Sequence, residues 1–123
     1  MSNDAMDFSL LVKSGIPVRS FKPGETIFKE GDPANELYVI ERGQVRIQLG
    51  NRQLDVLDEH NIFGEMALID GAPRSATAIA TTDVTLVPVS ERQFLFLISQ
   101  TPFFALNVMR VLARRLRAMN KAV

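Results

Sequence analysis

The chain has 123 residues, of which 46% are hydrophobic and 23% charged, and it contains no cysteine and one histidine. This length and composition indicate one folded domain with a hydrophobic core, and they exclude disulfides, thiolate or multi-histidine metal sites and cysteine nucleophiles. No apolar run approaches the roughly 18 residues that a membrane-spanning helix needs, and the first residues are polar and acidic, so we expect a cytoplasmic protein.

The net charge is zero, but the charges are unevenly distributed. Residues 1–100 hold nine basic and 14 acidic side chains, whereas the residues after them hold five basic side chains and no acidic one. Cations suit the C-terminal end of a helix, whose dipole they complement, and we favour this explanation. A contact with nucleic acid or another acidic surface is the alternative.

The chain changes character near residue 18. Residues 5–14 contain an apolar cluster that ends at Gly15, which predicts one or two helical turns. From Val18 to Val89, short runs of β-branched and aromatic residues alternate with turn signals about every ten residues, as in a β-sandwich or barrel. Residues 22–25 have the proline and glycine of a type II turn, and Gly50-Asn51 is a hairpin signal. His60 stands among turn residues, so we expect it to be solvated.

The C-terminal part is predicted to be helical. Ser90 and Gln93 form a capping box, and Thr101-Pro102 begins a second helix that reaches about residue 120. We expect one apolar face of this helix to pack on the strands: Phe104, Val108, Val111 and Leu112. A second stripe has the spacing of a coiled coil and predicts either self-association or packing within the chain: Ala105, Met109, Leu112, Leu116 and Met119.

Residues 62–80, IFGEMALIDGAPRSATAIA, interrupt the β pattern with a short helical segment. The start of such a helix offers free N–H groups, and Gly64 lets a ligand approach the backbone closely. Arg74 supplies a planar set of donors suited to a phosphate, and Ser75 adds a hydroxyl. Glu65 can accept hydrogen bonds from a sugar. Together these residues indicate a site for a phosphate joined to a sugar, although each residue alone has an ordinary structural explanation.

The sequence FGEMALIDGAPRSATAIA closely resembles the phosphate-binding cassette of cyclic nucleotide-binding domains. That family includes the bacterial cyclic AMP receptor protein, the regulatory subunits of cyclic-AMP-dependent kinase and cyclic-nucleotide-gated channels. The resemblance implies a mainly β fold: an antiparallel β-roll (double-stranded β-helix, jelly-roll-like) with a short N-terminal helix, a cassette helix and two C-terminal helices. One domain then spans 1–123, with an N-terminal helical segment at 1–17, the β-roll at 18–89 with its cassette at 62–79, and C-terminal helices at 90–123.

The resemblance also implies roles for individual residues. Arg74 is similar to the arginine that pairs with the cyclic phosphate, and Glu65 to the acid that binds the ribose 2′-hydroxyl. Gly64 and Ala67 correspond to backbone donors, and Ser75 to a phosphate contact. The implied ligand is cAMP, with cGMP possible, and no prosthetic group or metal is expected. The full ligand-binding set is Phe63, Gly64, Glu65, Met66, Ala67, Arg74 and Ser75.

By the same resemblance, the chain is a regulatory sensor and not an enzyme, and it transmits ligand binding through its C-terminal helix. Its expected partners are the nucleotide and either a second copy, bound through that helix, or an effector protein; no membrane contact is expected. Sequence-specific DNA binding is not expected, because no helix-turn-helix follows the long helix in this chain. The sequence leaves open whether the domain is free-standing or part of a larger protein. Candidate contacts for the base are Asn107, Arg110, Arg114, Arg115 and Arg117.

Two other classes of function compete with the sensor. A β-roll that serves only for interaction or dimerisation needs no nucleotide, and in it Arg74 and Glu65 pair with each other or with neighbours. A cupin-like enzyme needs clustered histidine ligands, which a chain with one histidine lacks. The sensor and the interaction module predict different responses to titration with cAMP.

Overall fold

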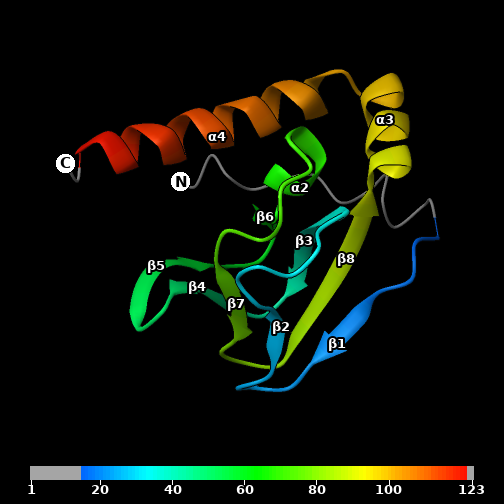
Figure 1. Cartoon of the computed structure of the whole chain (residues 1–123). Helices are drawn as coiled ribbons and strands as arrows, with labels where there is room; N and C mark the ends of the chain where they lie inside the picture. The colour runs from blue at the N-terminus through cyan, green and yellow to red at the C-terminus, as the bar shows by residue number, and fades with distance from the viewer. Residues whose placement is uncertain (1–14, 122–123) are drawn as a thin grey trace.

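The computed structural model describes residues 15–121, with side chains as far as residue 118. The helical turns predicted at 5–14 lie outside the described residues. Two four-stranded sheets form a β-roll, and helices α3 and α4 lie along one side of it (Figure 1). This arrangement confirms the predicted β-roll with C-terminal helices.

All neighbouring strands in both sheets are antiparallel. The first sheet has the order β1 (Arg19–Phe21), β8 (Val84–Ser90), β3 (Glu36–Arg42) and β6 (Ile62–Phe63). The second has the order β2 (Thr26–Phe28), β7 (Thr77–Ala80), β4 (Val45–Leu49) and β5 (Arg52–Leu57).

The predicted turns are present between these strands. The Glu25 N–H donates to the Lys22 carbonyl at 3.0 Å, and Gly24 has a φ of +88°, as a type II turn requires. Gly50-Asn51 joins β4 to β5, since the residues on either side of this pair face each other in the ladder. His60 is exposed, as predicted, and it has a positive φ of 71°.

Strand β3 explains why the roll has two cores. Its successive side chains point to opposite faces of the sheet, and both faces are buried. Leu37 and Val39 pack with residues of β8, α3 and α4, whereas Tyr38 and Ile40 pack inside the roll against β4, β7 and β6. The strand therefore ties the helices to the roll, and it places Tyr38 on the inner face.

Helix α3 begins as predicted, whereas α4 begins at Phe103, one residue after Pro102, and Thr101 ends α3 by donating its hydroxyl to the Leu97 carbonyl at 3.0 Å instead of capping α4. The capping box of α3 (Glu91–Gln100) is complete, with Gln93 N–H donating to Ser90 Oγ and Ser90 N–H donating to Gln93 Oε1. In α4 (Phe103–Lys121), the predicted apolar face is buried at Phe104, Val108 and Val111. No single helix among the described residues is long and apolar enough to cross a membrane; α3 and α4 pass that test only as a pair bent by 117°.

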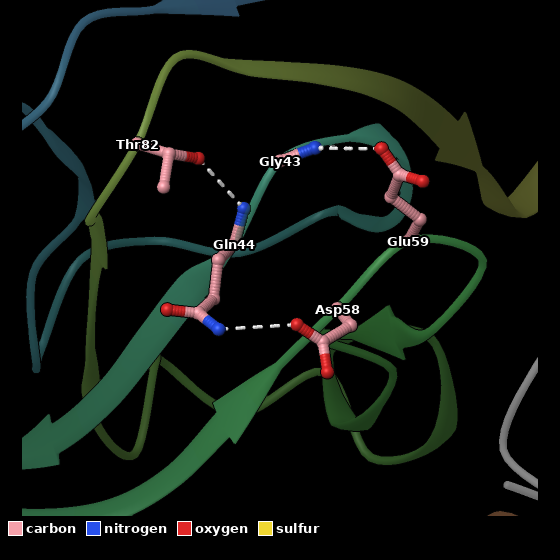
Figure 2. Close-up of a pocket in the computed structure, with 5 residues that line it drawn as sticks. All are labelled: Gly43, Gln44, Asp58, Glu59 and Thr82. Atoms are coloured by element: carbon pink, nitrogen blue, oxygen red, sulfur yellow. Dashed lines mark hydrogen bonds between the residues drawn. The ribbon is translucent and has the colours of Figure 1, made fainter.

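A shallow hollow of about 400 Å³ lies beyond the C-terminal end of β3 (Figure 2). Its polar groups bind one another. Gln44 N–H donates to Thr82 Oγ1 at 3.0 Å, Gln44 Nε2 donates to Asp58 Oδ1 at 3.1 Å, and Gly43 N–H donates to Glu59 Oε2 at 3.3 Å. The hollow therefore lies where three loops of the roll are hydrogen-bonded to one another: the β3–β4, β5–β6 and β7–β8 loops.

Replacement of Gly43 by alanine is expected to destabilise the protein strongly. Gly43 has a φ of +97°, and a Cβ there would stand 2.2 Å from the Asp83 carbonyl oxygen, which belongs to the backbone. We expect Gly43→Ala to lower the free energy of unfolding by about 3 kcal/mol, because backbone strain and overpacking add. Gly50→Ala is the matched control, since a Cβ at Gly50 meets nothing within 4 Å. Equal denaturation midpoints for the two variants would contradict this explanation.

Candidate functional site

The cassette begins with the two residues of β6. Gly64 follows β6 with a φ of +74°, and the short helical segment expected within residues 62–80 is α2 (Met66–Ile69), a single helical turn. A Cβ on Gly64 would stand 2.6 Å from Arg74 Nη1. Glycine at this position therefore permits both the backbone conformation and the close approach of the arginine.

The backbone of Arg74 is fixed against the turn between β2 and β3. Its N–H donates to the Asp32 carbonyl at 2.9 Å, and its own carbonyl accepts from the Gly31 N–H at 2.8 Å. In the same turn, the Glu30 N–H donates to Oγ1 of Thr77, the first residue of β7, at 3.0 Å. The turn between β2 and β3 therefore fixes the backbone of Arg74 just before strand β7 begins.

The guanidinium of Arg74 is buried inside the roll, with 7% of the residue exposed. Nη1 donates to the Gly64 carbonyl at 3.1 Å and Nη2 to the Glu36 carbonyl at 2.8 Å, while Nε is buried without a partner. No carboxylate of the described residues forms an ion pair with it. Burial lowers the pKa of the Arg74 guanidinium from its ordinary value, while the neighbouring Tyr38 and Glu36 act in the opposite direction.

Glu65 is also buried, and its partner comes from α4. Arg115 Nη1 donates to Glu65 Oε1, and Arg115 Nη2 donates to the Ile62 carbonyl at 2.6 Å. Arg115 Nε is the second buried nitrogen without a partner. Arg74 and Glu65 therefore do not pair with each other, and α4 is attached to the cassette through a charge-assisted bond that joins residues fifty positions apart.

The other predicted site residues differ in how far they are buried. Phe63 is 2% exposed, and its ring packs against Phe28 and Tyr38. Met66 and Ser75 are on the surface. The Ala67 N–H already donates to the Gly64 carbonyl, at the long distance of 3.3 Å.

Of the candidate base contacts on α4, Arg115 alone has a described hydrogen bond to the cassette. Arg110 and Arg117 are exposed, and Asn107 and Arg114 are half-buried.

Sequence reasoning missed a group of residues behind Arg74. Glu36 holds the guanidinium with its carbonyl, and its carboxylate accepts from Tyr38 at 2.8 Å and from Arg19 at 2.6 Å. Phe28 lies beneath the guanidinium, whose Cζ is 4.2 Å from the ring centroid. These residues belong to strands β1, β2 and β3, and no local sequence pattern distinguishes them from other strand residues. The sequence Glu30-Gly31-Asp32 is a turn signal that lies between two of these strands.

The ionisation of Tyr38 can be measured, and it reports on the surroundings of Arg74. Burial, and then the Glu36 carboxylate that its hydroxyl contacts, raise the pKa of Tyr38 above its ordinary value of 10.0. Above about pH 10 the unfolded chain therefore loses this proton first, and the free energy of unfolding falls as the pH rises toward the folded pKa. Tyr38 is the only tyrosine in the chain, so tyrosinate absorbance reports it directly. If Tyr38 ionised at the same pH in the folded protein as in the denatured chain, burial would not raise its pKa and this prediction would be wrong.

The hollow of Figure 2 is separate from the cassette. It lies past the C-terminal end of β3, whereas Arg74 contacts Glu36 at the start of that strand. Within the part of the chain that the structure describes, no three histidine, aspartate or glutamate side chains gather as metal ligands would. The cassette, with its uncompensated arginine, is therefore the candidate site.

Comparison with known families agrees with this geometry. Residues 18–101 match the model of the cyclic nucleotide-binding domain, which is well over half of the chain. The chain belongs to this family. The matched range contains the whole β-roll and the cassette, with Glu65 and Arg74, and it ends at the junction between α3 and α4, before Arg115.

The names of individual relatives refer to different cyclic nucleotides. The cyclic AMP receptor protein of Thermus thermophilus is 39% identical over 104 residues, which are 80% of this chain and 48% of the relative. A cGMP-dependent protein kinase of Plasmodium berghei is 39% identical over 70 residues, 57% of this chain and 8% of the kinase. The crystal structure of the Thermus thermophilus catabolite activator protein superposes with a TM-score of 0.80 at 37% identity, and covers 91% of this chain and 55% of its own. The chain thus spans about half the length of the Thermus protein.

Proposed function

We propose that the chain is a sensor domain that binds cAMP at the cassette and passes the binding event to α4. Arg74 takes the cyclic phosphate, Glu65 takes the ribose 2′-hydroxyl, and the main chain at Gly64 and Ala67 with the Ser75 hydroxyl completes the phosphate contacts. The domain binds its ligand without turnover and returns it unchanged. The name of the Thermus relative supports cAMP as the ligand.

The observation that carries this proposal is the state of Arg74. A buried cation normally has a carboxylate partner, because an uncompensated charge in the interior is costly. Arg74 has two carbonyl partners and an unused Nε, and only part of its donor capacity is taken. An anion that enters the site therefore gains strong hydrogen bonds and compensates the charge. An interaction module without a ligand has no use for such a residue, so we do not favour that alternative.

Transmission to α4 follows from the bond between Arg115 and Glu65. Oε1 of Glu65 accepts from Arg115 on the helix, and we assign the other carboxylate oxygen to a ribose hydroxyl. Ligand and helix then share one carboxylate, so the bound nucleotide tightens the attachment of α4. The exposed side chains Met109 and Leu116 lie on the same helix, and we assign to their stripe the contact with a second copy or an effector.

Calorimetric titration tests the proposal, with cAMP as ligand and 5′-AMP as the matched compound whose phosphate is not cyclic. We expect one cAMP to bind per chain and 5′-AMP to bind much more weakly, because the cassette is built around a compact phosphate fused to the sugar. Equal binding of both compounds, or of neither, would refute the proposal.

We expect cAMP to bind at least as tightly as cGMP. Position 75 is a serine flanked by the small Ala76, and Ser75 lies on the surface, so its hydroxyl is weakly placed to read a guanine. Competition between the two nucleotides measures the preference. A clear preference for cGMP would overturn this prediction, and Ser75→Ala then shows whether that hydroxyl causes it.

A further inference from the structure

We propose that Phe28 is a positioning residue, which holds the Arg74 guanidinium in place for an anion without neutralising it. The inference deepens the proposed function and rests on it for the identity of the anion. It concerns a residue of β2 that no cassette motif contains, 46 positions before the arginine that it supports.

The contact between the two residues is close and well supported. The guanidinium carbon lies 4.2 Å from the centre of the Phe28 ring, within the range of cation–π attraction. Phe28 is itself held by two other rings, since its centroid lies 6.1 Å from that of Tyr38 and 5.9 Å from that of Phe63. The three rings come from β2, β3 and β6, so the ring beneath the arginine is part of the roll's inner core.

An aromatic partner differs from an acidic one in what it leaves free. A carboxylate would occupy two in-plane N–H groups of the guanidinium and cancel its charge. A ring attracts the cation through the electrons of its face, and it uses no N–H donor. Arg74 therefore keeps its charge and its Nε donor, while the two carbonyls fix the ends of the guanidinium at Nη1 and Nη2.

Tyr38 and Glu36 add to this support. The Tyr38 ring centre is 5.5 Å from the Arg74 guanidinium carbon, and its hydroxyl donates to the carboxylate of Glu36 at 2.8 Å. That carboxylate is also bound by Arg19, so it is already paired and does not form an ion pair with Arg74. The Glu36 carboxylate therefore acts on the Arg74 charge without bonding to it, and Phe28 is the nearer of the two rings to the guanidinium.

The test compares Phe28→Leu with Phe28→Tyr, which keeps a ring. Phe21→Leu is the matched control, because Phe21 is partly buried against the same core cluster. The first readout needs no ligand: the NMR signal of the Arg74 Nε–Hε group, its order parameter and its ring-current shift. The second readout is the dissociation constant of cAMP.

In the wild-type protein we expect an ordered Arg74 Nε–Hε group with a ring-current shift from Phe28. In Phe28→Leu we expect this order to be lost and cAMP to bind about tenfold more weakly, while Phe28→Tyr restores both. An unshifted or mobile Arg74 signal in the wild type would overturn the inference even if no variant folds. So would a Phe28→Leu variant that matches Phe21→Leu in both readouts. If no cAMP binds to the wild type, the proposed function fails, but the NMR readout still decides the role of Phe28.

Discussion

Replacing Arg74 by alanine is expected to weaken cAMP binding at least ~100-fold, a loss of about 2.7 kcal/mol or more. The side chain is the one buried cation inside the roll among the described residues that lacks a carboxylate partner. Removing it takes away charge-assisted bonds to the phosphate, and no neighbouring cation replaces them, because Arg115 is committed to Glu65 and Ile62. Calorimetry with cAMP measures the effect.

Two controls separate this effect from damage to the fold. Arg46→Ala removes an arginine from β4 whose Nε donates to Gln48, outside the cassette, and should leave cAMP affinity unchanged. Arg74→Lys keeps the charge but loses the planar set of donors, and should bind cAMP with an intermediate, about tenfold lower affinity. If Arg74→Ala, still folded by circular dichroism, bound cAMP as well as Arg46→Ala does, the assignment of Arg74 would be wrong.

Replacing Arg115 by alanine is expected to loosen the C-terminal half of α4. The side chain makes two bonds to the cassette region, and nearby Leu116 and Arg117 are exposed. Loss of these bonds should speed amide exchange over residues 112–118 by roughly ten- to a hundredfold, because local opening then costs less. Hydrogen exchange followed by mass spectrometry measures this, with and without cAMP.

The same experiment tests transmission. In the wild type, cAMP should slow exchange in α4 as well as in the cassette, whereas in Arg115→Ala the slowing should be confined to residues 62–80. Arg117→Ala is the matched control, since it removes an exposed arginine two residues further along the same helix. If cAMP left exchange in wild-type α4 unchanged, or if the two variants behaved alike, Arg115 would not couple the ligand to the helix.

Much of the fold was predictable because its signals are local. Strand β4 follows from strict alternation, the type II turn from Pro23 and Gly24, and the start of α3 from the capping box of Ser90 and Gln93. Each of these depends on residues within a few positions of one another. The two-residue strand β6 was not predicted, because so short a strand exists only through its pairing with β3.

The candidate site divides in the same way. Gly64, Glu65 and Arg74 stand in one motif, so the sequence indicated them together. The partners that determine what these residues can do, Phe28 and Arg115, lie on β2 and α4. Their contacts span 46 and 50 positions, and no local pattern connects them to the cassette. The sequence therefore predicted that these three residues form one candidate site, but not that α4 is attached to Glu65.

The proposed function makes the unused Nε–H of Arg74 the donor to a cyclic phosphate, and NMR observes that group directly. The measurement is a titration of the full chain with cAMP while the Nε–Hε signals of its arginines are followed. We predict that the Arg74 signal shifts and saturates at a one-to-one ratio, and that the signal of Arg46 stays in place. A saturating titration in which the Arg74 signal does not move, or the absence of any saturation at millimolar cAMP, would contradict the account.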